Sequence, residues 1–240
     1  QMTDTYNYLT EDIYSKNKVL YYKEKPIRKN NWHTILSEIG WSKLHVNWIK
    51  LFNSYHPNPY KNSQFGLLDV PSDGDCLFHC LAKALSSTGE NYYESEDIRK
   101  MLADSIHQEQ FDTIISLYRC LKDSDDFDEE WDPYEIETLE AFKVKLIQGG
   151  HDYWCDHILL QLIVQQLKLN VFILEQNECE HYYEKYSFMT TYREEYDSIL
   201  LLYINGSHFQ LLGHFKDTMH QLFTHKTLPL EIKKLYEIIS

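Results

Sequence analysis

The sequence predicts an α+β fold, in which helices precede, interrupt and follow a small number of strands. Two observations predict it. Apolar residues recur at three- and four-residue intervals over several segments, which is typical of amphipathic helices. Elsewhere, short apolar runs end at turn-forming residues, and SILLLYINGSHFQLL has the form of a β-hairpin around Asn205 and Gly206.

Composition limits the class of protein. The 240 residues are 43% hydrophobic and 15% aromatic, which suffices for one large domain with a core. A net charge of −14 argues against nonspecific binding to nucleic acid and favours a neutral or basic partner. The five cysteines lack the spacing of a disulfide framework, and residues 1–20 are polar. We therefore expect a cytoplasmic monomer without a membrane segment.

Residues 1–60 are expected to form a helical N-terminal extension. In NWHTILSEIGWSKLHVNWIKLFNSY the apolar positions have helical spacing, which is interrupted at Gly40. The segment HPNPYKNSQ then contains two prolines and is typical of a linker. The main domain is accordingly expected at 61–220, with a C-terminal helix within 221–240.

The main domain opens with FGLLDVPSDGDC, which predicts a short strand, a tight loop and then a helix at about 77–86. The segment ESEDIRKMLADSIHQEQFDTIISLY predicts a helix, and a further helix at 156–167 should precede a strand at 170–174. Residues 123–137 are densely acidic. They are either a solvated loop with a helix start or a surface for a basic partner.

Cys76 lies where the acidic loop meets the first turn of the predicted helix. The N–H groups and the dipole of a helix N-terminus favour an anion and lower the pKa of a thiol. The same N–H groups, with those of the loop, are able to hold the oxyanion of a tetrahedral intermediate, and Gly74 allows a tight turn there. The alternative is a small buried hydrophobic residue beside an ordinary helix start.

A thiol nucleophile needs a base, and strand parity selects one of the twelve histidines. His208 begins the second strand of the predicted hairpin, and Gln210 lies on the same face of that strand. The pair has the form of a base and the group that orients it. His214 has the same parity but lies later in the strand, and it ranks second.

Three blocks of the chain resemble the ovarian-tumour (OTU) family of deubiquitinating cysteine proteases. DGDCLFHCLAKAL matches the family's Asp-Gly-X-Cys-Leu-Phe segment. YWCDHILLQLIVQQLKLNVFIL resembles its middle block, and LLLYINGSHFQLL resembles the block in which an aromatic residue follows the catalytic histidine. The blocks occur in the family's order over about residues 64–215. The resemblance implies a papain-like fold, a small central sheet flanked by helices, and neither a cofactor nor a metal.

Carried over position by position, the resemblance implies that Cys76 is the nucleophile and His208 the general base. It implies that Asp73, three residues before the cysteine, is the acid. Many members have Asp or Asn two residues after the histidine, where this chain has Gln210. The group that orients the base is therefore Gln210, Asp73 or another side chain.

The implied activity is hydrolysis of the isopeptide bond after the C-terminal glycine of ubiquitin or of a ubiquitin-like modifier. The backbone amides of Gly74, Asp75 and Cys76 would form the oxyanion hole. Trp154 and Phe209 are candidate walls of a narrow substrate channel, although core packing explains both aromatic residues as well. The alternative function is a module that binds ubiquitin without cleaving it.

Two further hypotheses concern the outer parts of the chain. Trp32, Trp41 and Trp48 either pack onto the catalytic domain or dock a second ubiquitin, and their helical spacing favours packing. The abundance of Lys, Asn, Ile and Tyr is typical of an AT-rich genome, and small members of the family occur in viruses and intracellular bacteria. A host-directed effector in the host cytosol is the corresponding hypothesis.

Two groups of cysteine and histidine residues are candidate zinc sites, because zinc prefers these ligands. One group is Cys76, His79 and Cys80, and the other lies at 151–157. Neither has the paired spacing of a zinc finger or ribbon, so the sequence predicts no metal site.

Overall fold

The computed structural model describes residues 4–59, 61–127, 129–177, 179, 181–186 and 191–239. The strands are β1 (Tyr6–Tyr8), β2 (Ile13–Lys16), β3 (Val19–Tyr22), β4 (Lys25–Pro26), β5 (Trp41–Lys43), β6 (Phe65–Leu68), β7 (Leu169–Asn177), β8 (Tyr182–Lys185), β9 (Asp197–Ile204), β10 (His208–Phe215) and β11 (Met219–His220). The α-helices are α1 (Trp32–Ile35), α2 (Val46–Ser54), α3 (Cys76–Ser86), α4 (Ser95–Ser105), α5 (Gln108–Asp123), α6 (Leu139–Ile147), α7 (His157–Gln166) and α8 (Leu230–Leu235), and the 3₁₀ turns are η1 (Leu36–Ile39) and η2 (Gly150–Asp152).

A seven-stranded sheet forms the centre of the molecule, in the order β5-β6-β10-β9-β7-β8, with β11 paired to β10. β7 and β9 are parallel, and β10 is antiparallel to both β6 and β9. The predicted hairpin is confirmed as β9–β10. Asn205 and Gly206 have φ values of 52° and 70°, as expected for a turn that requires left-handed residues at both central positions.

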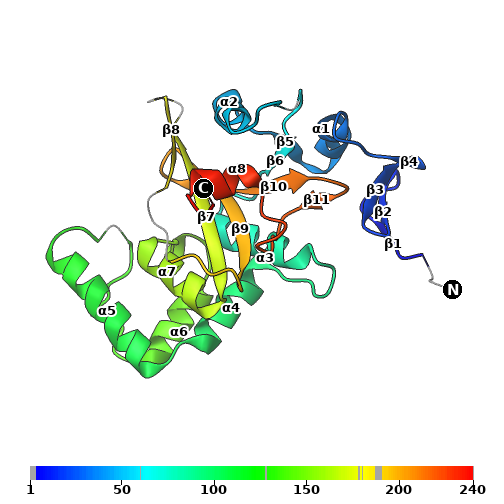
Figure 1. Ribbon diagram of the computed structural model, residues 1–240. Helices are drawn as coiled ribbons and strands as arrows, with labels where there is room; N and C mark the ends of the chain where they lie inside the picture. The colour runs from blue at the N-terminus through cyan, green and yellow to red at the C-terminus, as the bar shows by residue number, and fades with distance from the viewer. Residues whose placement is uncertain are drawn as a thin grey trace.

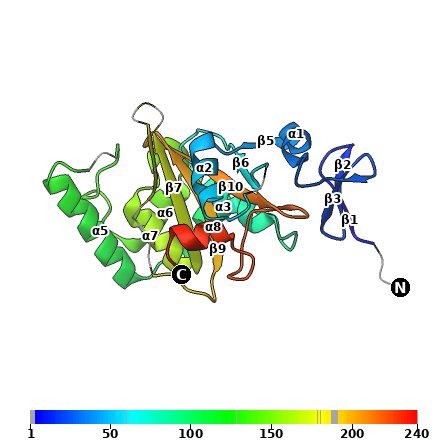
Figure 2. The ribbon, with the colours of Figure 1, turned by 45° about the horizontal axis from the view of Figure 1, so that its top comes forward.

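Two apolar cores lie on the two faces of this sheet. Alternate residues of β7 and β9, such as Val171 and Leu201, pack in the core that α3 to α7 cover. The residues between them, such as Phe172 and Leu200, pack with Trp48 of α2 and with α8. Figures 1 and 2 show the corresponding arrangement of helices on both sides of the strands. The α+β prediction is thereby confirmed, with a central sheet flanked by helices.

The expectation of a helical N-terminal extension is wrong in part. β1 to β4 form a separate four-stranded antiparallel sheet, in which Tyr8, Tyr14 and Tyr21 stand next to one another. Gly40, with φ of 92°, ends η1 in a left-handed conformation, and Trp41 then begins β5. β5 pairs with β6, so the central sheet crosses the boundary that the prolines predicted at 60–61.

The segment from 94 to 118 forms two helices where the sequence predicted one. Ile106, with φ of −78° and ψ of 133°, is extended and ends α4. His107 then caps α5 through a reciprocal pair of hydrogen bonds with Gln110. The apolar spacing continues across this break because both helices face the same core, and periodicity alone therefore does not reveal it.

The acidic segment 123–137 is described except for residue 128. Asp123 ends α5, and the described residues after it form a loop. The next helix, α6, begins after Thr138, which caps it by accepting from the Ala141 N–H. The loop is not wholly solvated, since the Trp131 side chain is buried.

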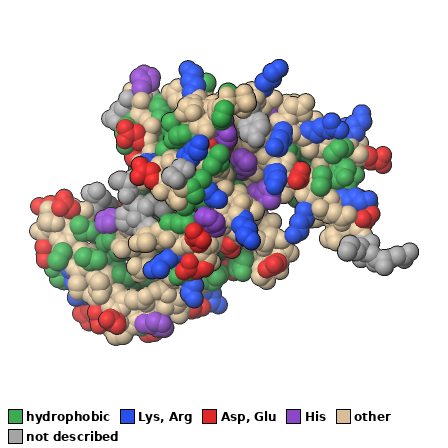
Figure 3. All heavy atoms as spheres, viewed as in Figure 1, with side chains coloured by type: hydrophobic (Ala, Val, Ile, Leu, Met, Phe, Trp, Pro, Cys, Tyr) green, Lys and Arg blue, Asp and Glu red, His purple; other side chains and the backbone are tan. Residues whose placement is uncertain are grey.

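Figure 3 shows Lys and Arg gathered over the part of the molecule where β1 to β4 and α1 lie.

No helix within the described ranges is both long enough and apolar enough to cross a bilayer.

Candidate active site

Cys76 is the first residue of α3, as the sequence predicts. The loop that precedes it begins where β6 ends, and Gly74 has φ of 91°, which an L-residue rarely adopts. The thiol is partly buried. The backbone N–H of Phe209, the second residue of β10, donates to Cys76 Sγ at 3.5 Å. The fold thus brings the helix start and the beginning of β10 together.

His208 lies next to this contact and is held on both ring nitrogens. Its Nε2 donates to Asp69 Oδ1 at 3.0 Å, and the Ser72 hydroxyl lies 3.4 Å from Nδ1. Within the described residues no hydrogen bond joins the imidazole directly to Cys76 Sγ; the amide of Phe209 lies on the sulfur instead. The chain neighbour of His208 thus contacts the sulfur, and a direct contact between the imidazole and the thiol stays a prediction.

Asp69 is the acid that faces the base, and the sequence did not identify it. It follows the last residue of β6 and also accepts from Gln210 Nε2 at 2.8 Å. Partial burial acts to raise the pKa of the Asp69 carboxyl, but the hydrogen bonds from Gln210 and His208 outweigh it and lower the pKa below its ordinary value. Asp69 is therefore ionised at neutral pH and able to stabilise an imidazolium.

Gln210 orients this acid, whereas the sequence expected it to orient the imidazole. Leu211 is paired with Leu68 across β10 and β6, so the next position along places Gln210 opposite Asp69. The strand parity was right, because His208 and Gln210 both reach Asp69. The pairing of β6 with β10 brings Asp69, the acid that the sequence did not identify, next to both side chains.

Asp73 does not serve as the acid of the base, which corrects the prediction from the family motif. Its two carboxylate oxygens lie 3.2 and 2.9 Å from His79 Nε2, one turn into α3. Burial acts to raise the pKa of Asp73, but the His79 contact and the Asp75 N–H lower it overall. Asp73 thereby fixes the loop onto the helix.

One of the three backbone amides predicted to form the oxyanion hole is already hydrogen-bonded. The Asp75 N–H donates to Asp73 Oδ1 at 3.0 Å and is therefore occupied. The amides of Gly74 and Cys76 stay as candidates, because Cys76 begins α3 and Gly74 belongs to the loop directly before it. The Asp75 carboxylate points away from the site toward Arg99.

The resting thiol is protonated. Burial raises the pKa of the Cys76 thiol, and the N–H groups of Phe209 and Leu77 lower it by less. The N–H groups at the helix N-terminus thus lower the pKa of the thiol as expected, but burial raises it by more. A thiolate at this position requires a base, which agrees with the nearby His208.

The two candidate channel walls differ. The Phe209 ring is buried and lies 4.6 Å from the Tyr203 ring, so the side chain is part of the core and only the backbone reaches the sulfur. The Trp154 side chain is 42% exposed, and its backbone N–H donates to Glu129 Oε2 at 3.4 Å. Burial raises the pKa of Glu129 to about 7.

The described side chains include no group of three or more His, Cys, Asp and Glu residues placed to hold a metal ion. The side chain of His151, part of the second group weighed as a zinc site, lies outside the described structure.

A cysteine at a helix N-terminus beside a histidine that is bonded to an aspartate is the constellation of a thiol hydrolase. The family model for OTU-like cysteine protease matches residues 71–215, more than half of the chain. The chain belongs to this family. The match includes Cys76 and His208, whereas Asp69 lies two residues before it.

Several solved structures are similar to the chain at low identity. An ovarian-tumour domain in complex with ubiquitin has 18% identity and a TM-score of 0.42, with 72% of this chain and 81% of that chain covered. The Hazara virus OTU bound to ubiquitin has 15% identity and a TM-score of 0.39, over 63% and 82%. An OTU deubiquitinase from Wolbachia pipientis has 11% identity and a TM-score of 0.40, over 74% and 98%. A search of curated proteins finds no match.

Proposed function

We propose that the chain is a deubiquitinase, which hydrolyses the isopeptide bond after the C-terminal glycine of ubiquitin or of a ubiquitin-like modifier. The observation that carries this proposal is the meeting of Cys76, His208 and Asp69 at one site in a member of a cysteine protease family. Ubiquitin as the substrate rests on the resemblance of the three sequence blocks.

The geometry assigns each group a step. The Nε2 side of His208 is engaged by Asp69, so Nδ1 is the nitrogen that takes the thiol proton. The thiolate of Cys76 attacks the carbonyl carbon of the scissile bond, and the amides of Gly74 and Cys76 hold the resulting oxyanion. The imidazolium returns its proton to the leaving lysine amine, which leaves a thioester on Cys76. His208 then deprotonates the water that hydrolyses this thioester.

The one sequence feature that favours a non-catalytic ubiquitin-binding module is Gln210, which stands where many family members have Asp or Asn. Asp69 supplies that acid from another strand, and Gln210 supports it. This removes the one argument for a damaged site.

A ubiquitin probe with an electrophilic C-terminus tests the proposal. We expect covalent labelling of the wild type and none of Cys76→Ala, with a panel of di-ubiquitins of every linkage defining the preference. Tight binding of ubiquitin without labelling would establish the module. Labelling only by probes built on a ubiquitin-like protein would assign that modifier. The cytoplasmic location, the monomeric state and the host-directed role stay predictions of the sequence.

A further inference from the structure

Asp75 occupies the N-cap position of α3 but does not cap the helix. Its backbone carbonyl accepts the first helical bond, from the His79 N–H, while its side chain makes no capping hydrogen bond. An aspartate at this position ordinarily accepts from N–H groups of the first turn, here those of Leu77 and Phe78. The departure occurs directly beside the nucleophile.

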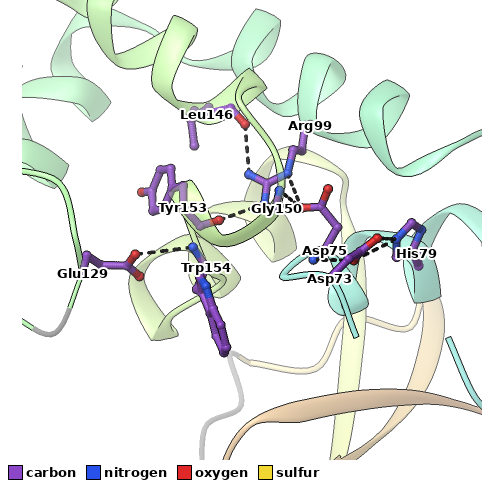
Figure 4. A network of polar contacts seen from close by, with 9 residues as sticks. All are labelled: Asp73, Asp75, His79, Arg99, Glu129, Leu146, Gly150, Tyr153 and Trp154. Carbon is purple, nitrogen blue, oxygen red and sulfur yellow. Dashed lines mark hydrogen bonds and ion pairs between the residues drawn. The ribbon is translucent and has the colours of Figure 1, made fainter. Parts of the chain in front are cut away.

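The carboxylate is bonded on the opposite side instead. Asp75 Oδ1 accepts from Arg99 Nε at 2.8 Å, from Arg99 Nη2, and from the Gly150 N–H at 3.0 Å. Figure 4 shows the Asp75 side chain directed at Arg99, away from the α3 turn that bears His79. The second oxygen, Oδ2, faces Gly149, where an added Cβ would come within 2.9 Å of it.

Burial and hydrogen bonds hold the Arg99 side chain in one place. Its side chain is 1% exposed, and Nη1 and Nη2 donate to the carbonyls of Leu146 and Tyr153 at 3.0 and 2.8 Å. The guanidinium also lies 4.0 Å from the centre of the Phe78 ring. α4 therefore presents a rigid cation to the residue that precedes the nucleophile.

A carboxylate at the N-cap would oppose the chemistry at this helix start. It would place a negative charge beside the Cys76 thiolate and would compete for the Leu77 N–H, which bonds to the sulfur. Burial already raises the pKa of the Cys76 thiol, and a nearby carboxylate would raise that pKa further.

We propose that Arg99 is a positioning residue of the active site, which holds the Asp75 carboxylate away from the N-terminus of α3 and so leaves that N-terminus to the thiolate and the oxyanion. The inference requires Cys76 to be the nucleophile but is independent of which modifier is cleaved.

The pH dependence of Cys76 alkylation by iodoacetamide tests this without any ubiquitin. Cys120 and Cys179 are exposed, so both are replaced by serine in the full chain, and peptide mass spectrometry separates alkylation of Cys76 from that of Cys155, which is also partly exposed. The other groups that interact electrostatically with Cys76 are unchanged in every variant; they include Asp73, Cys80, Cys155 and Tyr203.

In Arg99→Gln the carboxylate is released, and we expect the midpoint of the alkylation profile to rise by about one pH unit, which slows the reaction about tenfold at pH 7. In the double variant Arg99→Gln/Asp75→Asn no charge is left to move, and the midpoint should return to near that of the wild type. A purely structural role predicts a lower melting temperature with one shared midpoint for all three proteins, and that result overturns the proposal.

Gly149→Ala keeps both charges and serves if Arg99→Gln does not fold. The new Cβ crowds Asp75 Oδ2, so the midpoint should again rise. Gly89→Ala is the matched control, because Gly89 also has a positive φ, 76°, and has no atom within 4 Å of an added Cβ. Equal midpoints for these two variants would contradict the proposal.

Discussion

Three aspartates shortly before or beside Cys76 each have a different partner among the basic side chains. Asp69 is bonded to His208, Asp73 to His79, and Asp75 to Arg99. Only the first of these contacts reaches the base, and only the last is buried. Each aspartate thus ties the segment between β6 and α3 to another part of the fold. Only Asp69 contacts the base and is able to act in catalysis.

Removing the acid of the base tests this division. We expect Asp69→Ala to lower kcat by about 10²- to 10³-fold, because the imidazolium loses its counter-charge and the ring its orientation. Gln210→Ala should cost only about tenfold, since Gln210 acts through Asp69. Asp73→Asn, which alters an aspartate of the same loop, is the control. Hydrolysis of a fluorogenic ubiquitin substrate measures all three, and a larger loss in Asp73→Asn than in Asp69→Ala would restore Asp73 as the acid.

The local sequence predicts the nucleophile and the base but not the acid. Cys76 is marked by the loop and helix beside it, and His208 by a hairpin whose turn and parity lie within a few residues. Asp69 becomes a partner only through the register of β6 on β10. That register joins segments about 140 residues apart, and no local pattern specifies it.

Among the elements, the acidic loop contributes a half-buried carboxyl group that contacts the segment before α7. Glu129 accepts from the Trp154 N–H, and Trp154 follows Tyr153, whose carbonyl binds Arg99. The groups that act on the Glu129 charge are Asp156, which raises the pKa further, and Lys145 and Arg99, which lower it. The sequence showed the charge density of this loop but not which of its carboxyl groups the fold buries.

The pKa of about 7 makes this loop sensitive to pH. The pKa of Glu129 is raised in the folded state, so the folded protein binds the extra proton, and this contribution to stability is lost as the pH rises from about 4.5 to about 7. We expect Glu129→Gln to match the wild type at pH 5 and to be more stable by about 1 kcal/mol at pH 8, after allowance for partial exposure. This corresponds to about 2–4 °C in Tm.

Thermal unfolding at the two pH values measures the difference. Glu130→Gln is the matched control, because the neighbouring Glu130 is exposed and its neutralisation should leave both melting temperatures unchanged. Equal Tm differences for Glu129→Gln at pH 5 and pH 8 would contradict the assignment.

The pair of strands that carries the base depends on two glycines. Gly66 of β6 and Gly213 of β10 are opposite each other, and Trp41 and Met219 pack onto both. A Cβ at Gly213 would come within 2.7 Å of Met219 Sδ and 2.8 Å of the Trp41 ring. The absence of side chains at both positions thus leaves room for the Trp41 indole over the two strands.

Gly213→Ala should therefore overpack this layer and destabilise the protein by about 2 kcal/mol, or about 4–8 °C in Tm. Met219→Ala removes one of the two clashes. We expect the double variant to be less destabilised than the sum of the two single variants, as a thermal-unfolding double-mutant cycle would show. Strict additivity would mean that Met219 does not contact the new methyl group.

At the scale of the whole molecule, residues 4–59 divide into two parts. Trp32, Trp41 and Trp48 are buried, so the packing hypothesis is confirmed over docking of a second ubiquitin. Trp32 lies against Phe215, and Trp48 Nε1 donates to Gln176 of β7 at 3.2 Å. The part that includes α1, β5 and α2 is therefore integral to the catalytic domain, which the two prolines of the linker did not reveal.

The four-stranded N-terminal sheet is attached more lightly. Ile13, Leu20 and Ile27 are its buried apolar anchors, and the Leu20 N–H donates to the Asp217 carbonyl. On the surface, Tyr6 and Tyr8 are exposed. Removal of this sheet takes away three buried apolar side chains, whereas removal of the tryptophans opens both faces of the central sheet.

Two truncations test this division. A chain that begins at residue 28 should fold and keep its reactivity toward the ubiquitin probe, with a Tm lowered by about 6–24 °C, because it loses three anchors at about 1–2 kcal/mol each. A chain that begins at residue 55 loses all three tryptophans and β5, each buried tryptophan costing about 3–5 kcal/mol, and should not fold. Thermal unfolding, near-UV circular dichroism and probe labelling distinguish the two. If the shorter chain melted cooperatively near the temperature of the full chain, the domain would begin at the prolines after all, and the tryptophans would be a covering that the catalytic fold does not need.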